Sequence, residues 1–349
     1  MHFLNDQETY NFQFDERYNV DFKTGGDLFE DGDAYALEDL LRLVKQQQSE
    51  DDDKTPDQVL SSTAFCSDED TLIWGLSILC KSSIGRAIAF DARFEDWALE
   101  VDDIEDGYPI IDAQLRILIL PRGTPSVSAL SKSYYDRVQF LLNLGRGLRM
   151  IWQEMNGVRT RIDLTADDQI FFERLRSADM DIMALRMIWD LRLDGYAALW
   201  RNMIAGHLGD VAVAANGFWE QEEFPSGLAH TFLTWMGCDH LLAECDNRSL
   251  DEMDARLQRS VNDVCGISML TGNDILNLGR LPEGGSYLAP LARTLCYSAE
   301  FRHIPDPVND AHLRQILEEC SEIIRPPLMF HDTELERKIF PDRIIDTLA

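Results

Sequence analysis

The stretch YYDRVQFLLNLGRGLRMIWQEM (residues 134–155) is the central element of this sequence and predicts a long helix. On a wheel of 3.6 residues per turn, one side collects five apolar side chains: Val138, Leu141, Leu148, Trp152 and Met155. Arg146 and Met150, four positions apart, fall on the opposite side. We therefore expect one face of this helix to pack and the other to border a cleft.

Within that helix, the segment LGRGLRMIWQ (144–153) resembles the pattern L-x-H-E-L-R-H-x-W-Q of an uncharacterised bacterial family of predicted zinc metallopeptidases with zincin-like domains. A zincin helix uses two histidines one turn apart to bind zinc and a glutamate beside the first to polarise the metal-bound water. Here Arg146, Met150 and Gly147 occupy those positions. A guanidinium repels a dication, a thioether binds zinc poorly and glycine accepts no proton. The resemblance therefore implies a degenerate, inactive relative that is retained for binding a peptide or protein.

If that descent is correct, Arg146→His with Met150→His restores two imidazoles one turn apart, and Gly147→Glu restores the base. Replacing a helix-interior glycine is also expected to add up to about 1 kcal/mol of helix stability. The same residues are equally typical of an ordinary packing helix. The alternative is therefore an unrelated acidic, all-helical interaction or adaptor protein.

The next apolar segment, over about 165–191, repeats its large side chains at steps of three and four and predicts a helix buried on nearly all sides. It contains Asp179 and Asp181, and a buried carboxylate must be paired or bound to metal. The resembled family has its third zinc ligand on this helix, which implies Asp179 as the counterpart and Asp181 as a second choice. With an arginine at the former ligand position, we expect Asp179 to form an ion pair with Arg146, or else with Arg174.

Residues 227–246 contain a group of metal-capable side chains: His230, Cys238, His240, Glu244 and Cys245. The spacing C-x-H-x4-C matches no structural zinc pattern, and such residues in an apolar helix are typically core. A third hypothesis, an active metal-dependent hydrolase with a rearranged site, would use His230, His240 and Asp179. We expect no cofactor, and zinc only if the site is rebuilt.

The composition restricts the partners that this chain can bind. The sequence has 349 residues, 62 Asp and Glu against 32 Lys and Arg, and a formal net charge of -30. Such a charge repels nucleic-acid backbones and anionic membranes, and it favours solubility or a peptide or protein partner with a basic surface. No apolar run is long enough to cross a bilayer, and the N-terminus lacks the pattern of a secretion signal, so we expect a cytoplasmic protein. Seven cysteines, an odd number, indicate reduced thiols.

Strand patterns precede the central helix. WALEV (97–101) alternates as a half-buried strand, and LRILIL (115–120) is the strongest strand signal. Strands followed by a loop and the central helix give the order of a zincin upper subdomain. We therefore predict an α+β fold that is mostly helical, with a small zincin-like sheet packed on a helical body.

The remaining sequence sets the expected organisation. We predict further helices over 34–48, 71–80, 84–93, 195–223 with a break at Gly206 or Gly209, 249–264, 288–298 and 309–324, and an ordered turn over 278–287. The charged run before Pro56 has little to bury and is typical of a linker. The expected divisions are an acidic N-terminal segment (1–56), a metallopeptidase-like domain (57–325) and a C-terminal tail (326–349).

Overall fold

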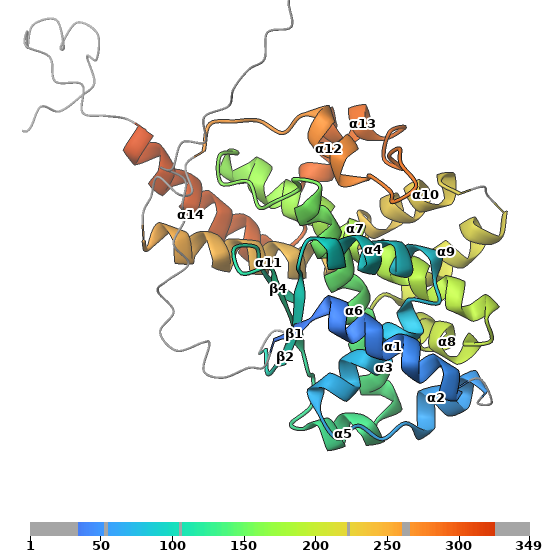
Figure 1. The fold of residues 1–349 in the computed structure, drawn as a ribbon. Helices are drawn as coiled ribbons and strands as arrows, with labels where there is room; N and C mark the ends of the chain where they lie inside the picture. Colours follow the sequence, from blue (N-terminus) through green and yellow to red (C-terminus); the bar gives the residue numbers. More distant parts are fainter. Residues whose placement is uncertain (1–33, 52–54, 105–106, 222–223, 260–265, 325–349) are drawn as a thin grey trace, which may run out of the picture. The chain divides into compact units, whose positions relative to one another are not determined.

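The computed structural model describes residues 34–51, 55–104, 107–221, 224–259 and 266–324. Residues 1–33 and 52–54 of the expected acidic N-terminal segment and the whole expected C-terminal tail (326–349) lie outside these ranges. Within them the chain is mostly helical with a small mixed sheet, which confirms the α+β class (Figure 1).

The elements follow one another in this order: β1 (Tyr35–Ala36), α1 (Leu37–Asp51), α2 (Pro56–Ser62), α3 (Asp68–Leu79), α4 (Ser83–Phe94), β2 (Ala98–Asp102), β3 (Ile110–Asp112), β4 (Ile117–Pro121), α5 (Val127–Lys132), α6 (Tyr134–Met155), α7 (Ala166–Leu193), α8 (Ala197–Ala205), α9 (Gly209–Gln221), α10 (Ser226–Trp235), α11 (Asp239–Leu257), α12 (Gly272–Leu278), α13 (Ala292–Tyr297), η3 (Ala299–Arg302) and α14 (Pro307–Ile324).

The sheet has the strand order β1-β2-β4-β3. Its central strands β2 and β4 run parallel, with Leu99 opposite Leu118, while β1 and β3 pair antiparallel at the two edges. Both strands predicted from the sequence are present. The carboxylate of Asp112 accepts hydrogen bonds from the backbone of Gln114 and Leu115, which fixes the turn between β3 and β4.

Helix α6 lies between strand β4 and helix α7, and two glycines make this possible. A Cβ atom on Gly145 would lie 3.0 Å from Cβ of Ala184 in α7. A Cβ atom on Gly147 would lie 2.5 Å from a methyl of Leu118 in β4. The missing side chains therefore let the backbone of α6 approach both neighbours closely.

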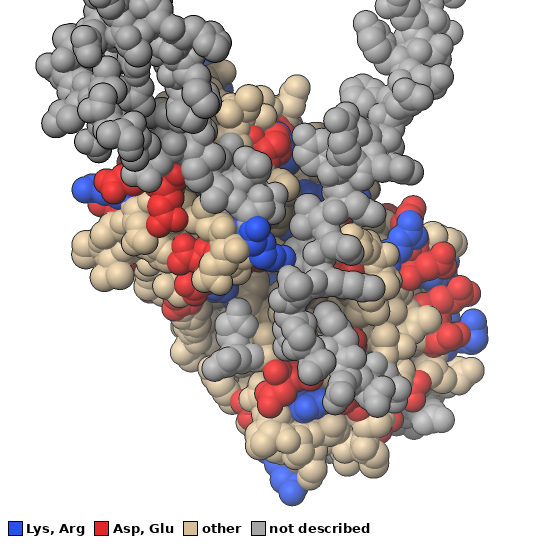
Figure 2. Space-filling view, turned by 90° about the vertical axis from the view of Figure 1, so that its left-hand side faces the viewer, with Lys and Arg blue, Asp and Glu red and all other residues tan. Residues whose placement is uncertain are grey.

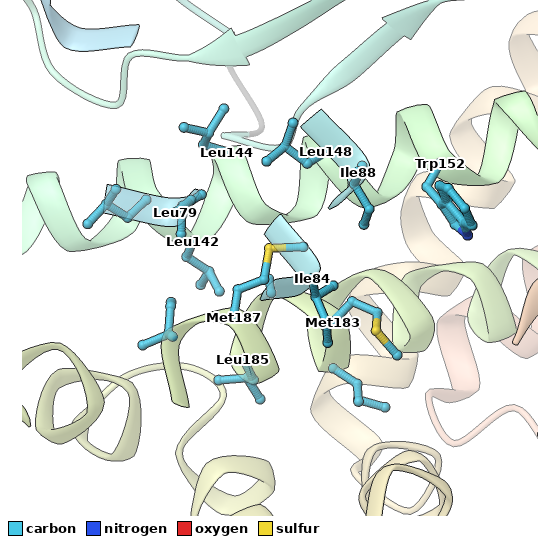
Figure 3. Packing of buried hydrophobic residues seen from close by; sticks show 14 of the residues in the cluster. Leu79, Ile84, Ile88, Leu142, Leu144, Leu148, Trp152, Met183, Leu185 and Met187 are labelled. Carbon is cyan, nitrogen blue, oxygen red and sulfur yellow. The ribbon is translucent and has the colours of Figure 1, made fainter. Parts of the chain in front are cut away.

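The main core is built around α6 and α7. Figure 3 shows Leu142 of α6 pointing toward Met187 of α7, with Leu144 and Leu148 on the side of α6 that faces the strands. All of these side chains are buried. A second, smaller cluster joins the start of α7 to α11 and α14 through Ile170, Leu250 and Ile316.

Helix α1 contributes to the same main core. Leu37, Leu40, Leu41 and Val44 are buried there, and α1 packs against α3. The boundary expected at residue 56 therefore lies between α1 and α2, which both contribute to the main core. Residues 52–54 of the expected linker are outside the described ranges.

The helix boundaries test the sequence patterns. The predicted break at Gly206 or Gly209 is confirmed, because α8 ends at Ala205 and α9 begins at Gly209. The helix start predicted at Ser249 is wrong, because Ser249 lies inside α11. Its hydroxyl donates to the carbonyl of Cys245, 2.9 Å away, one turn earlier in the same helix.

The described cysteines are free thiols, as expected: Cys66, Cys80, Cys238, Cys245, Cys296 and Cys320. Cys66 is exposed and Cys238 is half-buried, and the other four are buried. Burial raises the pKa of the Cys80 thiol to about 12 and that of Cys245 to about 11. Cys80 and Cys245 are therefore packing groups that stay protonated at neutral pH.

Candidate functional site

Arg146 and Met150, which stand at the two histidine positions of the resembled motif, do not border an open cleft. Arg146 and Met150 lie one turn apart on α6, as predicted, but they are only 8% and 9% exposed. Nearly every residue of α6 from Arg137 to Glu154 is buried. The expectation of one packed and one open face is therefore wrong, because β4 and α7 enclose the helix from two sides.

Arg146 is held by a set of polar and aromatic partners. Its Nε donates to Oδ1 of Asp181 at 2.5 Å, and its Nη1 donates to Oδ1 of Asn143 at 3.0 Å. The guanidinium carbon lies 4.8 Å from the ring centroid of Tyr108. Burial acts to lower the pKa of Arg146, but the Asp181 carboxylate outweighs this, so the net pKa is raised. The other oxygen of Asp181 accepts from Nε1 of Trp235 at 2.8 Å.

Asp179 forms a second buried ion pair, with Arg149. The pair is bidentate, with distances of 2.6 and 2.9 Å, and both side chains have no exposed surface. Asp179 also accepts from Gln153 at 2.7 Å and from the hydroxyl of Tyr287 at 2.9 Å. Burial, and then the charge of Asp179, raises the pKa of Tyr287 well above its usual value, so its hydroxyl stays a donor.

The predicted partner of Arg146 therefore needs correction. The structure pairs Arg146 with Asp181 and Arg149 with Asp179, whereas the sequence predicted Arg146 with Asp179. Arg174, the other partner considered, instead holds Asp246 at 2.5 and 2.6 Å. The carboxylate that pairs with Arg146 is thus that of Asp181, the second choice.

Gly147, which stands where the resembled motif has its glutamate, faces the sheet. The side chain of Leu118 fills the space beside it, and Leu118 itself is fully buried. A glutamate at position 147 would have to displace that leucine. The packing opposes the expected gain in stability from Gly147→Glu, because an added side chain would meet Leu118 at 2.5 Å.

The histidines and Asp179 of the rearranged-site hypothesis are in different environments. His230 is exposed on α10, with its ring 5.2 Å from that of Phe218. His240 is exposed on α11, with its ring 5.1 Å from that of His207. Asp179 is completely buried and its oxygens are occupied. Within the described ranges, no three His, Cys, Asp or Glu residues are placed to hold a metal ion.

Three aromatic members of this buried network were not identified from the sequence. Tyr108 follows the loop after β2, Trp235 ends α10, and Tyr287 closes the turn after α12. The glycine-rich turn over 278–287 was the available signal, because it brings Tyr287 onto Asp179 and the carbonyl of Leu278 onto Arg149 at 2.9 Å. Long-range contacts of this kind leave no spacing pattern in the sequence.

Comparison with known proteins adds no relative: no family model, no curated protein and no solved structure matches this chain. Among the helices in the described ranges, none combines the length and the apolar character needed to cross a membrane. The chemical character of the site thus rests on its own geometry. Arg146 and Arg149 each have a carboxylate partner, while the hydroxyl of Tyr108 and Nη1 of Arg149 have no hydrogen-bond partner among the residues that the structure describes.

Proposed function

We propose that this protein is a non-catalytic relative of the zincin-like metallopeptidases that binds a peptide or protein. The observation that carries the proposal is the ion pair between Arg146 and Asp181. It joins the position of the first histidine ligand in the resembled motif to an acidic residue on the following helix, where that family has its third ligand. A cation on the protein thus stands where the resembled family would hold a metal cation.

Two further features support the proposal. Helix α6 lies beneath the small sheet and beside α7, which is the arrangement that the resemblance implies. The acidic surface suits a partner with basic groups: Figure 2 shows Asp and Glu side chains gathered along both margins of one face. With a net charge of -30, such a surface accelerates the approach of a basic partner at low ionic strength.

The first prediction concerns metal and activity. The purified protein is expected to contain no stoichiometric zinc and to cleave no unstructured protein substrate, because Arg146 repels a dication and Gly147 supplies no base. Elemental analysis after dialysis and a casein-cleavage assay measure both. About one zinc per chain retained after dialysis, or cleavage that a chelator abolishes, would refute the proposal.

Descent from a zinc helix is tested by rebuilding the ligands. Arg146→His with Met150→His is expected to bind zinc through both imidazoles and the Asp181 carboxylate, and its Tm is expected to rise with the logarithm of the zinc concentration once the site is saturated. The control Asp310→His with Arg314→His places two histidines one turn apart on the exposed side of α14, where Asp181 is not available as a ligand. Calorimetry should show tighter zinc binding to the first variant. If the two double variants bind zinc with equal affinity, Asp181 does not act as a zinc ligand.

A further inference from the structure

A cavity of about 390 Å³ lies at the N-terminal end of α7, away from the ion pairs of α6. Its apolar wall comes from Ile170 and Phe171 of α7 together with Ile304 and Leu313 from the α14 region. All four side chains are at most 8% exposed, so the wall belongs to the packed interior. The volume and the mixture of apolar wall with a few charged groups fit a binding pocket for a side chain or small molecule.

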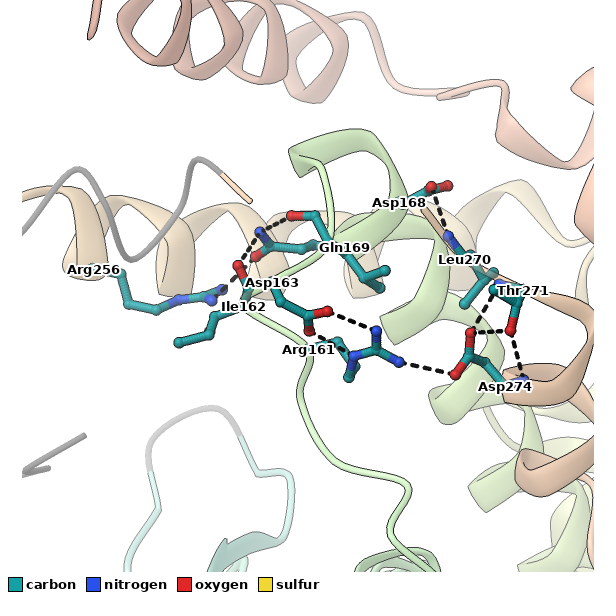
Figure 4. A network of polar contacts seen from close by, with 10 residues as sticks. Arg161, Ile162, Asp163, Asp168, Gln169, Arg256, Leu270, Thr271 and Asp274 are labelled. Atoms are coloured by element: carbon teal, nitrogen blue, oxygen red, sulfur yellow. Dashed lines mark hydrogen bonds and ion pairs between the residues drawn. The ribbon is translucent and has the colours of Figure 1, made fainter. Parts of the chain in front are cut away.

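The rim of the cavity is fixed in place. The backbone of Thr165 donates to the carbonyl of Ser268 at 2.9 Å, and the backbone of Leu270 donates to Asp168 at 3.0 Å. Figure 4 shows Asp168 directed at Leu270 beside the network of Arg161 and its acidic partners. Met269 stands between these two anchored residues, lines the cavity and is 72% exposed. The rim therefore offers a positioned, adaptable apolar side chain to a ligand.

Among the charged groups that line the cavity, both arginines are paired with aspartates, and one carboxylate has no ion-pair partner in the described part of the chain. Arg302 is paired with Asp168 and lies 4.6 Å from the ring centroid of Phe171. Arg174 is paired with Asp246, as described above. Asp167 lines the cavity, is exposed, and has no hydrogen bond or ion pair to any part of the chain that the structure describes. The unmatched charge of the cavity is therefore negative.

We infer that this cavity binds a lysine side chain of a partner peptide. The apolar stem of the lysine would pack against Met269 and Ile304, and its ammonium group would form an ion pair with the Asp167 carboxylate. This rests on the proposed function and names the chemistry of its partner. A lysine combines an apolar four-carbon stem with a compact cation, which matches a wall of this kind ending at a free carboxylate. Burial and then the neighbouring Asp168 raise the pKa of Asp167, and the opposing charge of Arg302 does not cancel this, so a bound ammonium would stabilise the ionised carboxylate.

The test uses the full-length protein and the fluorescein-labelled, amidated peptide Ala-Leu-Lys-Leu-Ala in anisotropy titrations. We expect millimolar or tighter binding, and weaker binding at high salt. Replacing the lysine of the peptide by norleucine, which keeps the stem and removes the charge, should weaken binding roughly fivefold, the upper range for a partly exposed ion pair. Met269→Trp, an exposed change at the rim, should block entry.

The protein-side variant is Asp167→Asn, with Asp210→Asn as its matched control, because each aspartate is exposed and is the second residue of its helix. Asp167→Asn should weaken the lysine peptide roughly fivefold and leave the norleucine peptide unchanged, while Asp210→Asn should change neither. Absence of peptide binding, or equal binding by Asp167→Asn, overturns the inference. Neither result bears on the zinc and cleavage measurements, which test the proposed function separately.

Discussion

Gly147 lies where α6 crosses β4, and one hydrogen atom in place of a side chain decides how closely they approach. A methyl group there would meet Leu118 at 2.5 Å, and Leu118 is enclosed by the core. Helix propensity favours alanine over glycine by about 1 kcal/mol, whereas overpacking a core costs about 1–3 kcal/mol. At this residue the steric cost is the larger effect.

We therefore expect Gly147→Ala to lower the free energy of unfolding by about 1 kcal/mol, and Gly147→Glu to lower it further because a carboxylate would also be buried. Urea unfolding measures both. The control is Gly217→Ala in α9, where no atom lies within 4 Å of the added Cβ and a gain of about 0.5–1 kcal/mol is expected. If Gly147→Ala and Gly217→Ala raise the free energy of unfolding equally, α6 does not approach β4 as closely as described.

At the level of elements, Arg137 joins three helix ends. It lies in the first turn of α6, is 2% exposed, and donates to carbonyls at the ends of α2 and α5: Leu60 at 2.7 Å, Thr63 at 2.6 Å, and Ser131. Its guanidinium carbon also lies 4.7 Å from the ring centroid of Phe65. Burial lowers the pKa of Arg137. The arginine supplies donors to carbonyls that helix ends leave without partners.

Arg137→Met is expected to lower the free energy of unfolding by about 3 kcal/mol, because several buried carbonyls lose their donors at once. Hydrogen exchange should show early loss of protection in α2 and α5. Arg42→Met removes an exposed arginine from a pair within one helix and should change stability by less than about 0.5 kcal/mol. If protection from hydrogen exchange falls equally over the whole chain, including α2 and α5, Arg137 does not specifically stabilise the ends of these two helices.

The elements themselves were largely predictable. The span of α6 agrees with its sequence pattern, because Ser133 caps it by accepting from the backbone of Asp136 and Gly157 follows its end. The parallel pairing of β2 with β4 was not predictable, because strand order depends on contacts that spacing does not encode. The same limit applies to the candidate site. The sequence identified both aspartates on α7, but which arginine each one meets depends on how the two helices cross.

For the molecule as a whole, acidic groups dominate the response to pH. Burial raises the pKa of the Glu100, Glu154, Asp190 and Asp246 carboxyls, and Asp163, beside Arg161, has a lowered one. A carboxyl whose pKa is raised on folding binds more protons in the native state, so the free energy of unfolding falls as pH rises through that window. The general repulsion of the net charge of -30 acts in the same direction.

We therefore expect the Tm to increase as the pH is lowered from about 8 toward about 5.5, above the ordinary carboxyl pKa values near 4. Differential scanning fluorimetry across this range measures the change. About 0.5 M NaCl screens the general repulsion, so an increase that persists in salt belongs to the buried carboxyls. A Tm that falls steadily over this range would show that lowered carboxyl pKa values, such as that of Asp163, dominate instead.

The two ion pairs between α6 and α7 also restrict how the interior can move. Arg146 with Asp181 and Arg149 with Asp179 are adjacent cross-links, so any sliding of one helix along the other must break both in a place that water does not reach. Shear between these helices is the route by which many proteins pass a signal from one end to the other. Here such sliding would have to break both pairs, so a partner bound at the start of α7 would act on a helix that two buried ion pairs hold to α6.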